Sequence, residues 1–97
     1  MNKITKAEVI TAGAYESYGY DWDAVGVWAD ENGFYLGTDS GCSCNSAWEY
    51  YDDGALTGPL TADQVIEEVT SLMRDAGYGG HTQEDIDNVV EAIRAWH

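Results

Sequence analysis

The segment AVGVWADENGFYLGT, residues 24–38, constrains the fold more than any other part of this chain. Two runs rich in β-branched and aromatic residues flank the dipeptide Asn32-Gly33. Asn-Gly suits the two-residue type I′ loop of a β-hairpin, because both loop positions need a positive φ. The segment therefore predicts two antiparallel strands joined by a loop at Asn32-Gly33.

The alternation of side chains along these two strands predicts a buried face. With the loop at Asn32-Gly33, Ala29 pairs with Leu36 and Val27 with Thr38. One face of the hairpin then carries the apolar core candidates Val25, Val27, Ala29, Phe34 and Leu36.

Aromatic residues lie on the opposite face of the predicted hairpin. In this register Trp28 stands opposite Gly37, with Tyr35 beside it, and an aromatic ring over a cross-strand glycine stabilises a sheet. Both rings are exposed unless another segment packs over them. Tyr and Trp are favoured in cores and in interfaces, because they bury large areas and keep a polar tip. Two roles therefore remain open for them: core of a small sheet, or contact with a partner.

The rest of the first half also has the pattern of a sheet. AEVITAGAY, residues 7–15, carries β-branched residues in loose alternation and predicts a strand. Tyr18, Tyr20 and Trp22 are spaced by two, which places them on one side of an extended segment. We expect a small antiparallel sheet, a meander or hairpin, over about residues 7–51.

The second half predicts two amphipathic helices, over about residues 62–76 and 83–96. Thr61 with Gln64, and Thr82 with Asp85, have the spacing of capping boxes. The expected apolar stripes are Val65, Ile66, Val69, Leu72 and Met73 in the first helix, and Ile86, Val89, Val90, Ile93 and Trp96 in the second. Two helices packed against a small antiparallel sheet make an α+β fold, and 97 residues suffice for one domain, residues 1–97.

The charge of the chain restricts its partners. Eighteen acidic residues against four basic ones give a formal net charge of −14. Such a charge repels nucleic acid, which proteins bind through Lys and Arg, so we expect no direct nucleic-acid binding. It attracts basic protein surfaces. The N-terminal residues have no apolar stretch of signal-peptide length and no later stretch is long enough to span a bilayer, so we expect a cytoplasmic protein without membrane contact.

Cys42 and Cys44, in the run TDSGCSCNSAWEYY, are candidates for thiol or metal chemistry. A zinc site needs two further ligands in a suitable spacing, but the two histidines, His81 and His97, are sixteen residues apart. A disulfide between them closes a very short, strained ring, and the nearby acidic residues favour the unreactive thiol over the thiolate. The alternative is that the run forms a tight polar turn after a strand, followed by an aromatic return onto the sheet.

Three groups of neighbouring carboxylates, Asp52-Asp53, Glu67-Glu68 and Asp85/Asp87, are candidates for a divalent cation or for acid–base chemistry. The segment DENGFYLGTDSG lacks the ligand spacing of an EF-hand, and in so acidic a chain a carboxylate pair also fits a solvated surface. We assign no catalytic, metal-binding or cofactor-binding residues and expect no enzyme activity.

The stretch FYLGTDSGCSCNSAWEYY resembles a motif of small uncharacterised acidic proteins encoded by actinobacterial bacteriophages. The matching residues are Asp39, Ser40, Gly41, Cys42, Ser43, Cys44, Ser46, Trp48 and Glu49. The preceding YDWDAVGVWADENGFY is similar to the hairpin of that family, so the resemblance covers roughly residues 18–60. The sequence departs from the family pattern at Asn45 and Ala47. The resemblance implies a phage origin and a host cytoplasm, and it implies no reaction.

These observations favour a non-enzymatic phage accessory protein that binds a basic host protein through an acidic, aromatic-rich surface, in the sharpest form as a mimic of nucleic acid. The predicted partner-binding residues are Trp28, Tyr35, Asp30, Asp52, Asp53, Glu67 and Glu68. The alternatives are a thiol or metal site at Cys42 and Cys44, and a self-associating structural protein with Trp28 and Tyr35 buried between copies.

Overall fold

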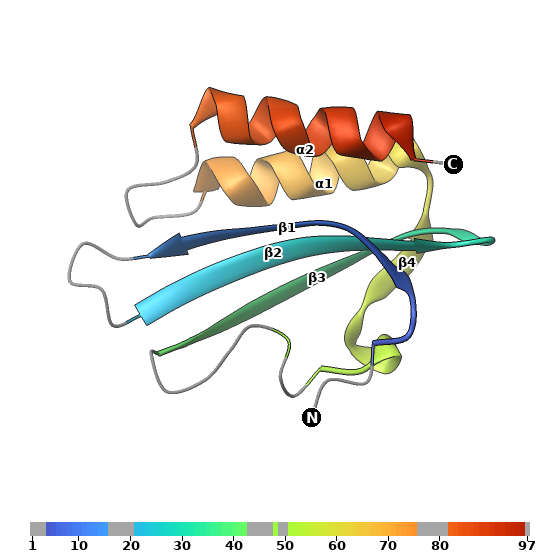
Figure 1. The fold of residues 1–97 in the computed structure, drawn as a ribbon, viewed down its shortest axis with the longest axis horizontal. Helices are drawn as coiled ribbons and strands as arrows, with labels where there is room; N and C mark the ends of the chain where they lie inside the picture. The colour runs from blue at the N-terminus through green and yellow to red at the C-terminus, as the bar shows by residue number, and fades with distance from the viewer. Residues whose placement is uncertain (1–3, 16–20, 43–47, 49–50, 76–81, 97) are drawn as a thin grey trace.

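The computed structural model describes residues 4–15, 21–42, 48, 51–75 and 82–96. Its elements are β1 (Ala7–Tyr15), β2 (Asp21–Asp30), β3 (Gly33–Cys42), the 3-10 helix η1 (Asp53–Ala55), β4 (Thr57–Leu60), α1 (Ala62–Asp75) and α2 (Gln83–Ala95). The strands form one antiparallel sheet in the order β1-β2-β3-β4. Both helices lie over the same face of the sheet, α2 against β1 and α1 against β2 and β3 (Figure 1). The predicted α+β fold with C-terminal helices is confirmed.

The hairpin of β2 and β3 turns one residue earlier than predicted. Asp30 pairs with Gly33, so the loop residues are Glu31 and Asn32. A side-chain oxygen of Asp30 accepts a hydrogen bond from the backbone N–H of Asn32 at 2.8 Å, which stabilises a turn beginning at Asp30. Gly33 has φ +142°, and a Cβ there would lie 2.8 Å from the carbonyl oxygen of Leu60. Position 33 therefore needs glycine both for its positive φ and for the close approach of β4, although it is not part of a type I′ loop.

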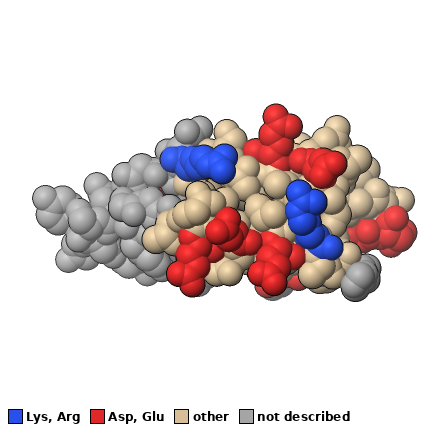
Figure 2. Space-filling view, turned by 90° about the horizontal axis from the view of Figure 1, so that it is seen from above, with Lys and Arg blue, Asp and Glu red and all other residues tan. Residues whose placement is uncertain are grey.

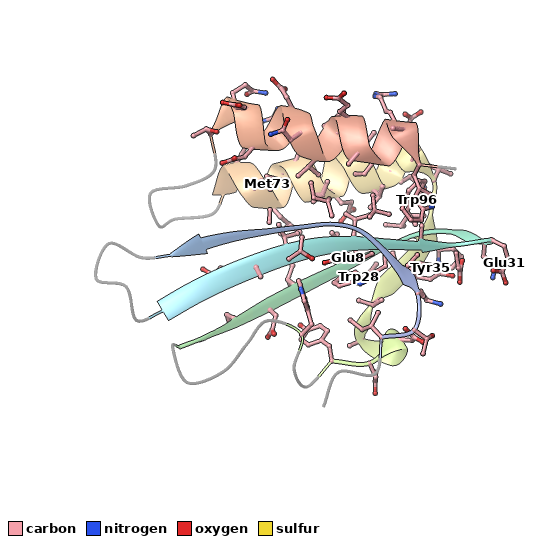
Figure 3. All side chains as sticks on the ribbon, viewed as in Figure 1. Glu8, Trp28, Glu31, Tyr35, Met73 and Trp96 are labelled. Atoms are coloured by element: carbon pink, nitrogen blue, oxygen red, sulfur yellow. The ribbon has the colours of Figure 1, made fainter. Side chains whose placement is uncertain are left out.

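The predicted register is wrong by two residues, but the predicted core face is correct. Ala29 pairs with Phe34 and Val27 with Leu36. A shift of two residues leaves every side chain on its original face, because the side-chain period of a strand is two. Val25, Val27 and Leu36 accordingly pack against the helices. In Figure 3 the labelled Met73 lies between the helix layer and the sheet, where this main core sits.

The fourth strand is absent from the sequence prediction. β4 pairs with β3 at Phe34 and Leu36, and it contains the cis peptide bond Gly58-Pro59. Its sequence, TGPL, is four residues long and has Gly and Pro at its centre, a composition typical of turns. The strands before it end at Cys42, and between residues 43 and 50 the structure describes only Trp48, which lies in a turn.

The helix boundaries and both capping boxes agree with the sequence prediction. Thr61 and Gln64 exchange side-chain hydrogen bonds with each other's backbone N–H, and so do Thr82 and Asp85. The apolar stripes are mostly buried, whereas Leu72 and Trp96 are 39% and 38% exposed and do not belong to the core. Neither of the two described helices has the length and hydropathy to cross a membrane.

Candidate functional site

The predicted partner-binding residues lie on two opposite sides of the molecule. Trp28, Tyr35, Asp30, Asp52 and Asp53 lie on or near the sheet face that points away from the helices. Glu67 and Glu68 lie on α1, on the other side of the sheet. The chain therefore does not bring the seven residues together into one site.

The aromatic residues form a second core under the sheet. Trp28, Tyr35 and Trp48 are 4%, 8% and 6% exposed, and Ile4, Tyr51 and Leu56 pack around them. The rings of Trp28 and Trp48 meet edge to face, with centroids 4.8 Å apart. Trp28 and Tyr35, labelled in Figure 3, lie beneath the strands. Of the two roles predicted for these rings, the fold assigns them the interior one.

Two glycines make room for this aromatic packing. A Cβ on Gly26 would lie 2.5 Å from Trp28, and one on Gly37 would lie 3.0 Å from it. Gly26 and Gly37 pair with each other across the two strands. The predicted aromatic-over-glycine contact therefore exists, although Trp28 pairs directly with Tyr35.

Lys6 joins the segment before β1 to the aromatic face. Its ammonium lies 3.0 Å from a carboxylate oxygen of Asp30 and 4.2 Å from the centre of the Tyr35 ring. The hydrogen bond to Asp30 raises the pKa of Lys6 above its ordinary value. Partial desolvation opposes ionisation of Asp30, but hydrogen bonds from Asn32 and Lys6 outweigh it and hold the pKa of Asp30 below its ordinary value. Lys6 and Asp30 therefore neutralise each other within the fold, and this ion pair has a structural role.

Two further carboxylates on this side also bind the chain itself. Asp53 accepts hydrogen bonds from the backbone N–H and the hydroxyl of Thr5, and these lower the pKa of Asp53. Asp39 accepts from the backbone N–H of Ser40 and of Trp48, both at 2.9 Å. Asp53 thus anchors the backbone and side chain of Thr5, and Asp39 anchors the backbone of Trp48.

The outer face of the helices carries several exposed carboxylates, and most of them have no partner within the described part of the chain. The exposed acidic residues on the helices are Asp63, Glu67, Glu68, Glu84, Asp85, Asp87 and Glu91, and the exposed basic residues are Arg74 and Arg94. Among the helix residues whose side chains the structure describes, seven negative and two positive ones leave a formal charge of −5. Asp85 takes part in its capping box and Asp87 accepts from Gln83, but within the described ranges the other five have no hydrogen bond or ion pair. Figure 2 shows this acidic face from above.

Of this acidic helix face, the sequence pointed to the pairs Glu67-Glu68 and Asp85/Asp87, and it predicted only Glu67 and Glu68 as partner-binding residues. Glu84, Asp87 and Glu91 follow one another at i, i+3 and i+7, a spacing that places them on the solvent side of α2. Asp63 and Glu67 are likewise one turn apart on α1. The other acidic residues of this face could have been predicted from the sequence, because each lies outside the apolar stripe of its helix.

One exposed apolar side chain, Leu72, lies beside the acidic helix face, and a second, Trp96, lies at the end of α2. Leu72 borders a surface hollow of about 230 Å³ together with Glu67, Glu68 and Ser71. Trp96 caps the C-terminal end of α2 and is labelled at that end in Figure 3. Single exposed apolar side chains are common on protein surfaces, so these two add apolar area but do not by themselves mark a contact.

A second hollow, of about 300 Å³, is polar and lies at the opposite end of the β2–β3 hairpin from its turn. It is lined by Asp23, Thr38, Asp39, Ser40 and Tyr51. Since both carboxylate oxygens of Asp39 accept backbone hydrogen bonds, this residue is held in place by the chain.

The structure does not test the predicted thiol or metal site at Cys42 and Cys44. Cys42 ends β3, but its side chain and the whole of Cys44 lie outside the described residues. In the part of the chain that is described, no three His, Cys, Asp or Glu side chains are grouped so as to hold a metal ion.

Comparison with curated proteins and with solved structures gives no match. The family model described as a domain of unknown function (DUF7574) matches residues 3–97. This match includes every strand and helix described above. The chain therefore belongs to the DUF7574 family.

Proposed function

We propose that this protein is a non-enzymatic accessory protein that binds a basic host protein through the acidic outer face of α1 and α2. The observation that carries the proposal is the division of carboxylates between the two sides of the sheet. On the aromatic side, Asp30, Asp39 and Asp53 are bound to Lys6, to backbone N–H groups or to Thr5, whereas the side chain of Asp52 has no such partner among the described residues. On the helix side, five exposed carboxylates have no such partner, and the described charged side chains of the two helices together leave a formal charge of −5.

A basic protein surface is the partner that this arrangement fits. Unpaired carboxylates on one face attract Lys and Arg over a distance comparable with the Debye length, about 8 Å at physiological ionic strength. Leu72 and Trp96 add apolar area at which a partner can exclude water. The aromatic residues of the sheet support the fold instead of the contact, so the proposed surface is acidic and only locally apolar. The resemblance to phage proteins supports a host protein as the partner.

The sharper form of the proposal is that the acidic helix face occupies a nucleic-acid-binding site. Carboxylates recur along α1 at Asp63 and Glu67, and along α2 at Glu84, Asp87 and Glu91. The two helices lie side by side (Figure 1), and Figure 2 shows acidic side chains along both of them; in this form of the proposal the carboxylates take the place of phosphates. A partner bound in this way cannot hold the protein and its nucleic acid at once.

The test compares two variants with equal charge. Glu67→Gln/Glu68→Gln/Glu91→Gln neutralises three exposed carboxylates on the helices, and the control Asp23→Asn/Glu31→Gln/Asp52→Asn neutralises three elsewhere. Both change the formal net charge from −14 to −11. A host protein captured on the wild-type domain at low salt is purified, and its affinity for each variant is measured by calorimetry.

We expect the helix variant to bind about tenfold more weakly than wild type, since exposed ion pairs are worth roughly 0.2–1 kcal/mol each, and the control to bind nearly as well. Equal losses in both variants would mean that only the overall charge matters, and no loss in the helix variant would reject this face. Displacement of a labelled DNA duplex from the partner distinguishes the mimic from a binder of another basic surface.

A further inference from the structure

The two edges of the sheet differ in their capacity to accept another strand. β4, at one edge, has four residues and contains Pro59, which has no N–H to donate. β1, at the other edge, has nine residues and no proline. Natural proteins block exposed edges with short strands, proline, charges or bulges. β4 therefore carries two of these devices, and the edge at β1 is the more open one.

Two features of β1 oppose pairing with a further strand, an irregular pairing with β2 and a charged side chain, and both lie at its N-terminal end. The pairing of β1 with β2 is irregular between Glu8 and Ile10, and Glu8 is also the one charged side chain in this strand. From Ile10 to Tyr15 the pairing with β2 is regular, residue for residue. Among the described residues, no backbone hydrogen bond connects β1 to any segment besides β2. The outward N–H and C=O groups of this regular stretch are free to pair with a further strand.

The surroundings of β1 indicate the chemistry of that strand. α2 packs directly over β1 and carries four acidic residues against one arginine. Beneath α2, Ile10, Ala12 and Val90 form a half-buried apolar rim. If a strand were added beside β1, its side chains on the helix side would contact these apolar residues near their Cα atoms, and their ends would lie close to α2. Lys and Arg suit that path, because each has an apolar stem and a cationic head.

We propose that β1 binds an extended basic segment of the partner protein as a fifth strand of the sheet. This inference rests on the proposed function and specifies how the partner binds. Backbone hydrogen bonds to β1 supply affinity, and Lys or Arg side chains beside α2 supply selectivity. A second copy of this chain is the poorer occupant, because pairing β1 with β1 would bring together two molecules with a formal charge of −14 each and their acidic α2 helices.

The experiment uses synthetic peptides and leaves the protein unchanged. The probe is a nine-residue peptide of alternating Lys and Val with blocked ends, and its matched control has the same sequence with every second backbone nitrogen methylated. Methylation removes N–H donors and keeps the charge, so it separates strand addition from simple attraction. Affinities are measured by calorimetry at low salt, and the contacted residues are mapped by amide NMR.

We expect the unmethylated peptide to bind at least tenfold more tightly than the methylated one, with the largest amide shifts in residues 10–15 of β1. Equal affinity of the two peptides, or shifts confined to α1 and α2, would overturn the edge proposal while leaving the acidic helix face as the binding surface. If neither peptide binds, the edge proposal is also overturned. The two charge-matched variants described under the proposed function then test the acidic helix face independently. If the protein forms a dimer that becomes more stable as salt is added, the occupant of the β1 edge is a second copy of this chain, and the proposed basic segment is rejected.

Discussion

Trp48 has a buried N–H group without an acceptor, and this makes an unusual prediction. Among the described residues, its Nε1 is the one buried side-chain nitrogen or oxygen atom without a hydrogen-bond partner. The ring itself is well packed, 6% exposed, against Trp28 and Tyr51. Trp48→Phe removes the N–H group and keeps an aromatic ring in the same place.

The expected change in stability is a difference between two opposing terms. Leaving a buried donor unsatisfied costs about 1–3 kcal/mol, and the substitution removes that cost. The smaller ring of Phe loses apolar burial and contacts worth roughly 1–2 kcal/mol. The free energy of unfolding of Trp48→Phe should therefore stay within about 1 kcal/mol of wild type. Trp28→Phe, in the same cluster, loses similar burial without the compensating gain and should cost about 1–2 kcal/mol.

The assay is urea denaturation followed by far-UV circular dichroism, because tryptophan fluorescence differs between the variants. Trp48→Ala serves as a control for burial of the ring and should cost about 3–5 kcal/mol. The reasoning is refuted if Trp48→Phe is destabilised as much as Trp28→Phe while Trp48→Ala behaves as expected. That result would mean that the indole N–H contributes a hydrogen bond to stability.

Two further predictions concern the main core and the segment before β1. Met73→Ala should lower the free energy of unfolding by about 2–5 kcal/mol, because Met73 is 1% exposed. Leu72→Ala, at a neighbouring position that is 39% exposed, should change the free energy of unfolding by less than about 1 kcal/mol. Similar losses of stability in the two variants would contradict the packing of α1. The lowered pKa values of Asp53 and Asp30 predict a pH dependence, because a carboxyl that is more acidic in the folded state stabilises the fold above its unfolded pKa. This contribution should be complete above about pH 5 and disappear as the pH falls below 4. Asp53→Asn should therefore show a smaller loss of stability between pH 6 and pH 3 than wild type does, and an unchanged loss would contradict the bonds from Thr5.

Sequence patterns predicted the elements that local chemistry determines. The helices follow from capping residues and a helical apolar period, and the packed face of the hairpin follows from alternation alone. The face survived a wrong register because the error was two residues. A shift of one would have moved Val25 and Val27 out of the main core.

The features that the sequence did not predict depend on contacts between distant segments. β4 exists because Gly33 lets its backbone approach, and its own sequence favours a turn. The burial of Trp28 and Tyr35 depends on Trp48 and on Ile4, which come from other parts of the chain. Local pattern could show that these rings share a face, but it could not show that the same chain covers them.

The distribution of charge within the helices connects stability with the proposed binding. Asp63, Glu84 and Asp85 lie in first turns, where the helix dipole favours carboxylates, and Arg74 and Arg94 lie in last turns, where it favours cations. These charged residues therefore have a structural explanation.

Glu67, Glu68 and Glu91 lie away from the first turns, where no such benefit is available, and they have no ion pair among the described residues. In a chain with a formal charge of −14, they add repulsion to the folded state without a compensating contact. Replacing them with glutamine should leave the free energy of unfolding unchanged or slightly raised. If the same replacement weakens binding, these three carboxylates contribute to recognition at a cost in stability.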